Sequence, residues 1–264
     1  MQHQITDWYD TPLYYDIVFD ADTAKEADFL EAVAIKFGGS RFTSGLKILE
    51  PACGSGRLVA ELAGRGHEVC GFDLNGHMLD HARERLRKKK LPAELWRDKL
   101  ETFSVPGRRR FDLAHCLVST FKYVSEEAGA VSHLCRVAQS LRKGGLYVLG
   151  LHLTDYARGG AEHERWSGSR GGVQVVCNTH TWPADRKTRA EALRTRLRIT
   201  RRGRTWVQET RWSFRTYDAA QLKKLLKCAP EFEHVASYDF TYDLNEPRKL
   251  DNSYADIVLV LRKK

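Results

Sequence analysis

The chain has 264 residues, of which 42% are hydrophobic, and it carries a formal net charge of +9 at pH 7. This length allows one large α/β domain, or one domain with an insertion, and the apolar content is enough for a sizeable core. No stretch is long and apolar enough to span a membrane, and residues 1–10 are too polar for a signal peptide, so we expect a cytoplasmic protein.

Aromatic side chains gather in the first part of the chain: Trp8, Tyr9, Tyr14 and Tyr15. Apolar residues then recur at helical spacing over residues 27–37, and Gly38-Gly39 provides a stop. Residues 1–44 are therefore predicted to form an N-terminal segment with one long helix. Its aromatics either fold over a ligand crevice as a lid, with Tyr14 or Tyr15 as the candidates, or simply pack the helix.

The stretch from Lys47 to Asp73 has the pattern of one βαβ unit. A short apolar run ends at Glu50 and leads into a turn of small residues, after which apolar residues follow at helical spacing. A glycine stop and a second short strand that ends at Asp73 complete the unit. In a doubly wound sheet, ligands bind at the carboxyl ends of such strands. Asp73 is therefore placed to bind the two hydroxyls of a ribose.

The turn itself narrows the type of nucleotide ligand. The dinucleotide fingerprint G-x-G-x-x-G fails because Val59 stands at its third glycine, and no P-loop sequence occurs. What is present is an acid followed by small residues at alternate positions: Glu50, Ala52, Gly54 and Gly56. Small residues let the backbone approach a ligand where a Cβ atom would clash. A glycine-rich turn with no ligand is the alternative interpretation.

This pattern resembles motif I of the class I S-adenosylmethionine-dependent methyltransferases. The resemblance implies S-adenosyl-L-methionine as the cofactor and S-adenosyl-L-homocysteine as the product. It implies cofactor-binding roles for the five positions named above: Glu50, Ala52, Gly54, Gly56 and Asp73. It adds Leu74 and Met78 beside the adenine, Asp98 near the adenine amino group, and Leu117 and Ser119 at the methionine portion. In such enzymes an N-terminal aromatic segment often folds over the cofactor.

The end of the fourth strand bears on the substrate class. Enzymes that methylate the exocyclic nitrogens of bases usually carry [DNS]-P-P-[FYW] here, whereas this chain has Ser119-Thr-Phe121 without prolines. The pattern looks more like that of amino-sugar N,N-dimethyltransferases and glycine N-methyltransferases. No Asp-Asn pair follows the fifth strand, and the six cysteines form no C-x-x-C pair, so we expect no metal site.

The composition changes between residues 158 and 216, where three runs alternate with period two: Val173–Trp182, Arg189–Thr200 and Thr205–Tyr217. They predict a three-stranded antiparallel cap over the crevice. Its second strand carries Arg194, Arg196 and Arg198 on one face. The insertion holds 14 Lys+Arg against 5 Asp+Glu, an excess that equals the net charge of the whole chain. The arginine row is either a solvated face or a positive rim that attracts an anionic acceptor.

The remaining chain completes the predicted fold. A helix begins near Asp218, and two strands follow it, Phe232–Tyr242 and Tyr254–Leu261. By the resemblance, the fold is a doubly wound α/β sheet of seven mostly parallel strands in the order 3-2-1-4-5-7-6, with the last strand antiparallel. Residues 45–157 and 217–264 then form the S-adenosylmethionine-binding domain, and residues 158–216 form the cap.

The fold and the resemblance together predict a reaction class. We favour methyl transfer to an amine or hydroxyl of a small metabolite by in-line displacement, with Tyr14, His152 and His180 as candidate bases. The alternatives are an RNA or protein methyltransferase that docks through the basic cap, and a non-enzymatic binding protein of the same fold. We expect a small-molecule acceptor and no nucleic-acid or membrane partner; no sequence feature indicates an oligomeric state.

Overall fold

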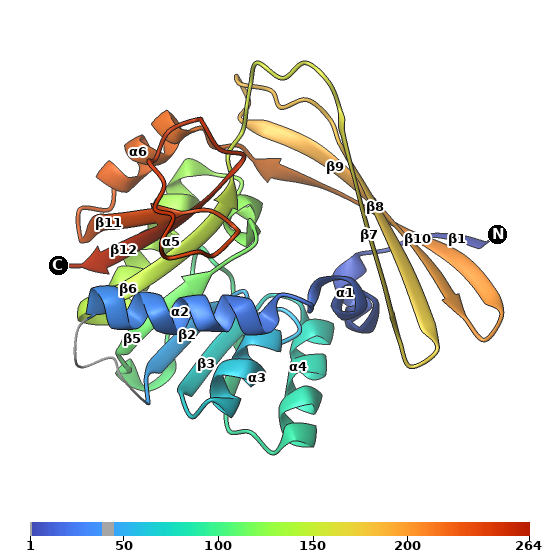
Figure 1. Cartoon of the computed structure of the whole chain (residues 1–264), viewed down its shortest axis with the longest axis horizontal. Helices are drawn as coiled ribbons and strands as arrows, with labels where there is room; N and C mark the ends of the chain where they lie inside the picture. Colours follow the sequence, from blue (N-terminus) through green and yellow to red (C-terminus); the bar gives the residue numbers. More distant parts are fainter. Residues whose placement is uncertain (1, 39–44) are drawn as a thin grey trace.

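A seven-stranded sheet forms the centre of the computed structural model, which describes residues 2–38 and 45–264. Its strands, in chain order, are β2 (Lys47–Pro51), β3 (Glu68–Asp73), β4 (Glu94–Arg97), β5 (Phe111–Cys116), β6 (Leu141–His152), β11 (Phe232–Tyr238) and β12 (Asp256–Lys263). They lie in the order β11-β12-β6-β5-β2-β3-β4 (Figure 1). Neighbours from β4 to β6 are parallel, and β12 is antiparallel to β6 and β11. The predicted order and the antiparallel last strand are confirmed.

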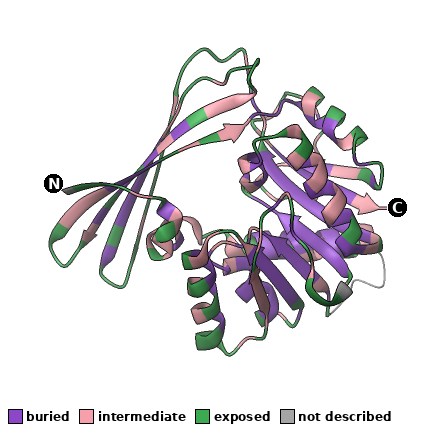
Figure 2. Cartoon of the chain, turned by 180° about the vertical axis from the view of Figure 1, so that it is seen from behind, coloured by how far each residue is buried: buried purple, intermediate pink, exposed green. Residues whose placement is uncertain are grey.

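Helices cover both faces of this sheet. One face packs against α2 (Thr23–Gly38), α3 (Arg57–Gly64) and α4 (Gly76–Lys89). The other packs against α5 (Glu127–Ser140) and α6 (Ala219–Lys227). The central strands are therefore buried on both sides, as Figure 2 shows, which is why they read as nearly continuous apolar runs. The helix stop predicted at Gly38-Gly39 extends outside the described residues, because Gly39 is not among them.

A second sheet rises from the carboxyl edge of the first and carries five strands where three were predicted. It has the order β1-β10-β9-β8-β7. Its members are β1 (Gln2–Ile5), β7 (Glu162–Arg170), β8 (Val173–Thr181), β9 (Ala190–Arg201) and β10 (Arg204–Arg215). The two missed strands lie at the edges and are mostly exposed, so neither shows the alternation that marks a half-buried strand. β1 pairs in parallel with β10, so the N-terminal segment contributes to the cap.

The two faces of this cap have different neighbours. One face, which we call the inner face, packs against the short helices η1 (Trp8–Asp10) and α1 (Pro12–Phe19), which lie between the cap and α4 (Figure 1). Its residues include Val175, Cys177, Leu197 and Ile199. Because side chains alternate along a strand, the arginine row of β9 lies on the opposite, outer face.

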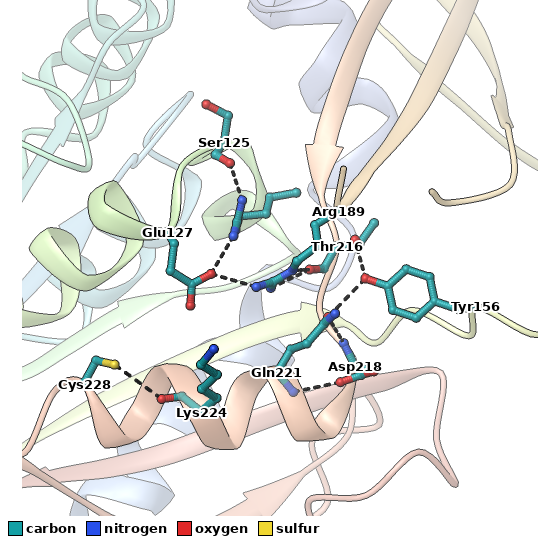
Figure 3. Close-up of polar contacts among 10 residues, drawn as sticks. Ser125, Glu127, Tyr156, Arg189, Thr216, Asp218, Gln221, Lys224 and Cys228 are labelled. Atoms are coloured by element: carbon teal, nitrogen blue, oxygen red, sulfur yellow. Dashed lines mark hydrogen bonds and ion pairs between the residues drawn. The ribbon is translucent and has the colours of Figure 1, made fainter. Parts of the chain in front are cut away.

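Two chain segments join the cap to the main domain, and polar contacts fix them there (Figure 3). Glu127, at the start of α5, accepts from Arg189 at 2.7 Å and from Arg215 at 2.5 Å. Both guanidinium groups lie over the ring of Tyr217. Beside them, Asp218 caps α6 in a reciprocal arrangement with Gln221, which confirms the predicted helix start. These contacts therefore hold the base of the cap in one orientation relative to the main domain.

Candidate cofactor site

A cleft opens at the carboxyl ends of β2 and β5. The side chains and backbone that line it come from α1, from the β2–α3 turn and from the β5–η4 connection, where η4 is Thr120–Tyr123. The lining residues include Tyr15, Glu50, Ala52, Gly54, Ser55, Arg57, Leu117, Val118 and Thr120. A wider hollow between the two hairpin tips of the cap is open to solvent and lies on peripheral turns. We place the site at the sheet edge because the predicted motif lies there.

Backbone strain is concentrated at this cleft. Ala52, with φ of 53°, and Val118, with φ of 56°, are non-glycine residues in the left-handed region, and Ser119 follows with φ of 64°. Such conformations cost of order 1–3 kcal/mol each and tend to occur where a binding site requires them. Here they turn the chain sharply after β2 and after β5.

The two glycines of the motif serve different purposes. Gly54, with φ of +53°, has nothing within 4 Å of where a Cβ atom would stand, so this point of the turn faces open space. A Cβ on Gly56 would lie 2.6 Å from the Cβ of Ala82, because α3 and α4 approach closely there. Gly54 therefore leaves room for a ligand, whereas Gly56 is required by packing.

The carboxylate of Asp73 holds the turn in place. One oxygen accepts the backbone N–H of Gly54 at 2.8 Å, and the other accepts that of Asn75 at 2.8 Å. Burial raises the pKa of Asp73 from its ordinary value, and these two N–H groups oppose the rise. Each carboxylate oxygen can accept a further hydrogen bond, so Asp73 has capacity left for a ribose hydroxyl.

Glu50 is the motif residue with an unused buried atom. Its side chain is 8% exposed, and its Oε2 has no hydrogen-bond partner among the described residues. Burial raises the pKa of Glu50 to about 8, although the positive charge of Arg57 opposes this. Arg57 itself forms a buried ion pair with Glu26 of α2. Arg57 and Glu26 were not predicted from the sequence, where an arginine at a helix start gives no distinctive signal.

The positions predicted to surround the adenine differ in exposure. Leu74 is half-exposed after β3, whereas Met78, in the first turn of α4, has no exposed surface. Met78 therefore offers no contact to a ligand in this conformation, contrary to expectation. Asp98 bonds through its backbone N–H to the Asp73 carbonyl at 3.2 Å, so the two strand ends are adjacent. Its carboxylate accepts the N–H groups of Lys99 and Ser104 and thereby shapes its own loop.

Of the two residues after β5 that were predicted to bind the cofactor, one lines the cleft and the other does not. Leu117 lines the cleft as expected, but the hydroxyl of Ser119 accepts the backbone N–H of His152 at 2.9 Å and ties β5 to β6. Val118 and Thr120, on either side of it, line the cleft instead. The left-handed turn at these residues reverses the direction of successive side chains, which no sequence pattern reveals.

Of the two lid tyrosines, Tyr15 reaches the cleft. Tyr14 packs against Trp206 of the cap, with ring centroids 6.1 Å apart. Burial raises the pKa of Tyr15 to about 12, so its phenol stays neutral. Beside it, the hydroxyl of Tyr9 donates to that of Tyr123 at 2.8 Å. The N-terminal aromatics thus pack largely against the cap, which was not predicted, and Tyr15 also lines the cleft, so its role as a lid stays a prediction.

The two candidate histidines lie in different places. His152, a residue exposed to solvent, ends β6 at the carboxyl edge of the main sheet; its imidazole packs on Phe240, and partial desolvation and then the charge of Lys122 lower its pKa. His180 lies on the outer face of the cap, where its ring packs against His163 and Trp182. Because that face points away from the lid, the placement of His180 argues against a catalytic role.

The residues present fit S-adenosylmethionine. Gly54 leaves space beside the turn, Asp73 can accept from a ribose, and the unpartnered buried oxygen of Glu50 suits a positively charged group. Among residues 2–38 and 45–264, no three His, Cys, Asp or Glu side chains are grouped to hold a metal ion. Within the same ranges, no helix is long and apolar enough to cross a membrane.

Comparison with known proteins supports this assignment. Residues 48–145 match the family model described as a methyltransferase domain. A ubiquinone biosynthesis O-methyltransferase of Alkalilimnicola ehrlichii is 32% identical over 116 residues, which are 44% of each chain. A protein named as a methyltransferase in a Geobacillus strain is 27% identical over 108 residues, 41% of this chain and 43% of the relative. The chain thus covers less than half the length of these relatives.

Solved structures resemble the whole chain, cap included. An S-adenosylmethionine-dependent methyltransferase of Clostridium acetobutylicum has a TM-score of 0.76 at 17% identity, covering 97% of this chain and 98% of the other. DesVI of Streptomyces venezuelae has the same TM-score and identity, covering 98% and 99%. CalS10 of Micromonospora echinaspora, an amino pentose methyltransferase, has a TM-score of 0.69 at 16% identity and full coverage of both chains. At these identities the likeness establishes the fold.

Proposed function

We propose that this chain, a class I S-adenosylmethionine-dependent methyltransferase by its domain match and fold, transfers a methyl group to an amine or hydroxyl of a small metabolite. The observation that carries the proposal is the cleft itself. The strained turn after β2, the open space at Gly54 and the free accepting capacity of Asp73 meet at the carboxyl edge of the sheet. This is where doubly wound folds bind nucleotide ligands.

We assign the cofactor contacts to the residues that line or border this cleft. Asp73 would accept the ribose hydroxyls, and the side chain of Leu74 would cover one face of the adenine. The carboxyl group of Glu50, whose Oε2 is unpartnered, would face the ammonium of the methionine portion. Bound there, the cofactor supplies a methyl group already activated by its positive sulfur.

The protein then has to align the acceptor and keep water out. Alignment of two reactants can supply about 7–11 kcal/mol in favourable cases. Tyr15 and the neighbouring Tyr9–Tyr123 pair are placed to cover the cleft from the lid side. His152 is our candidate for taking a proton from the acceptor, because it ends β6 beside Ser119, whose neighbours Val118 and Thr120 line the cleft.

The cap and the charged side chains around the cleft bear on the size and charge of the acceptor. CalS10, an amino pentose methyltransferase, and KedS8, a sugar N-methyltransferase, share the fold of the chain, which supports a small acceptor bound beneath the cap. The arginine row lies on the outer face, so it does not support an anionic acceptor at the cleft. Arg57, which lines the cleft, is already paired with Glu26, and Lys122, two residues beyond Thr120 of the lining, is paired with Glu191. We therefore propose an acceptor without a formal negative charge.

The test is transfer of a labelled methyl group from S-adenosylmethionine to a panel of amino sugars, simple amines and phenols. We expect label in a small product, unchanged by nuclease or protease treatment of the acceptor fraction. Loss of label after nuclease treatment would favour an RNA methyltransferase, for which the basic outer face would be the docking surface. Failure to bind S-adenosylmethionine by isothermal titration would favour a non-enzymatic protein of this fold.

A further inference from the structure

His115 of β5 is buried in the core with no apparent partner. It has no exposed surface, and neither ring nitrogen has a hydrogen-bond partner in the described part of the chain. His133, which is equally buried, makes the contrast clear: its nitrogens bond to the Leu100 carbonyl at 3.0 Å and to the Tyr147 hydroxyl at 2.7 Å. Because leaving a buried polar group unpaired costs about 1–3 kcal/mol, an unpaired histidine calls for an explanation.

The strand register places His115 beside Glu50. β2 and β5 are parallel neighbours, and Ile48 pairs with Leu113 and Leu49 with Ala114. The next position along each strand therefore brings Glu50 and His115 side by side, on the sheet face that packs against α2 and α3. Both side chains are buried, and each has an unpartnered polar atom. Two groups that could satisfy each other thus occupy neighbouring positions directly below the cleft.

Among the described groups around Glu50 and His115, the nearby cation, Arg57, is already paired with another carboxylate. Groups that act on Glu50, or on which Glu50 acts, come from the elements packed around it: Glu26 of α2, Arg57 and the backbone of Val59 in α3, Asp73 of β3, Cys53 of the turn and Cys116 of β5. Arg57 also acts on His115, but its charge is matched by the ion pair with Glu26. An ionised Glu50 would therefore need an additional positive or hydrogen-bonding group.

We propose that His115 is a positioning residue for Glu50, which it holds in place while Glu50 releases its proton on binding the ammonium group of the ligand. In the ligand-free structure the Glu50 carboxyl and the His115 ring are neighbours that are not hydrogen-bonded to each other, and Glu50 keeps its proton. On binding, the proton leaves to solvent, and the neutral imidazole presents its N–H to the carboxylate after tautomer exchange. The inference rests on the proposed cofactor site and assigns His115 a role in binding the methionine portion.

The directions of the two pKa shifts agree with this exchange. Burial raises the pKa of Glu50 to about 8, so the carboxyl is protonated at neutral pH before binding. Burial, and then Arg57, lower the pKa of His115 to about 3, so the imidazole stays neutral throughout. Affinity for an ammonium-bearing ligand should then rise about tenfold per pH unit below pH 8, because one proton is released for each ligand bound.

The experiment is isothermal titration of S-adenosylhomocysteine between pH 5.5 and 8, in pairs of buffers with different ionisation enthalpies. We expect release of about one proton for each ligand bound near pH 6.5. The comparison ligand is 5′-methylthioadenosine, which has the adenosine but lacks the amino-acid tail. It should bind with no proton release, because nothing in it would ionise Glu50.

Three variants separate positioning from stability. His115→Leu should fold, because it removes an unpartnered buried group, but should weaken S-adenosylhomocysteine binding at pH 7 by about tenfold or more, the effect of losing a hydrogen bond to a charged group. His115→Asn keeps a donor and should restore part of the affinity. His133→Leu, the matched control, should lower thermal stability and leave proton release unchanged.

The outcomes are distinct. Parent-like affinity and proton release in His115→Leu would overturn the role of His115. Equal loss of binding for both ligands in that variant would indicate a purely structural role and would also overturn it. If the parent protein binds neither S-adenosylhomocysteine nor 5′-methylthioadenosine, the proposed function itself is wrong.

Discussion

Lys122, on the short helix after β5, forms a buried ion pair with Glu191 of the cap strand β9. Their side chains are 3% and 12% exposed, and the Lys122 ammonium also lies 5.2 Å from the ring centroid of Phe214. The ion pair therefore joins η4 of the main domain directly to the cap. The orientation of the cap over the site therefore depends on a charge pair that is largely shielded from water.

Removing one member of this pair should be more harmful than removing both. Lys122→Met leaves the Glu191 carboxylate buried without its cation, which should cost about 3–5 kcal/mol of unfolding free energy. The double variant Lys122→Met with Glu191→Leu should recover most of this loss. Denaturant unfolding of the parent, the two single variants and the double variant measures the coupling. Additive losses would show that the pair is already well solvated.

Asp73 should dominate binding of the ribose. Asp73→Ala removes a charge-assisted acceptor and should weaken S-adenosylmethionine binding by roughly 1.5–3 kcal/mol. It also frees the N–H groups of Gly54 and Asn75, so Asp73→Asn, which can still accept from one of them, is the control for loop distortion. Calorimetric titration measures both. Parent-like affinity in Asp73→Ala would contradict the placement of the ribose.

Gly54 should be needed for the ligand rather than for the fold. Gly54 and Gly45 have similar φ values, +53° and +63°, and both face open space where a Cβ atom would stand. Gly54→Ala and Gly45→Ala should therefore carry similar backbone strain and lower the melting temperature by similar amounts. We expect loss of S-adenosylmethionine binding in Gly54→Ala alone. Equal retention of binding in the two variants would place the ligand elsewhere.

The stability of the ligand-free protein should fall as the pH rises from about 4.5 to about 8, because of Glu50. The folded protein holds the Glu50 proton up to a pKa of about 8, whereas the unfolded chain releases it near the ordinary glutamate value. Between these two values the folded state binds more protons, so each rise in pH lowers the free energy of unfolding. Glu50→Gln should flatten this part of the curve in denaturant unfolding at pH 5 to 8.5. An unchanged slope would show that Glu50 ionises normally.

The arginine row should not affect acceptor capture. Arg194 and Arg196 lie on the outer face, and Arg196 is already paired with Glu209. Arg194→Ser with Arg196→Ser should therefore leave both the cofactor affinity and the apparent KM for the acceptor within about twofold of the parent at low salt. Initial rates with the acceptor identified by methyl labelling provide the measurement. A large rise in KM that disappears with added salt would restore the interpretation of a charged rim.

The main sheet could be predicted from the sequence because its signals are local and reinforce one another. The turn from Glu50 to Gly56, the acid at Asp73 and the capping residue Asp218 each constrain the backbone in a known way, and all three lie where expected. The cap was only partly predictable. β7 is exposed along most of its length and β1 is four residues long, so neither carries a hydrophobic pattern.

The details of the site depended on geometry that no single segment encodes. Which of Tyr14 and Tyr15 reaches the cleft is decided by how α1 packs against the cap. The turn at Val118 and Ser119 exchanges the side chains that face the ligand. The pairing of His115 with Glu50 depends on the register between two strands more than sixty residues apart. These features depend on tertiary packing between distant segments, so no local sequence pattern predicts them.

The parallel pairing of β1 with β10 has a consequence for the order of folding. Thr210 of β10 bonds to the carbonyl of Thr6, a partner 204 residues away in the chain. At a synthesis rate of about 5–20 residues per second, the first strand waits roughly 10–40 seconds on the ribosome before its partner emerges. The main sheet can assemble much of its parallel core during that interval. The edge of the cap is therefore expected to close late, shortly before β11 and β12 emerge and complete the main sheet.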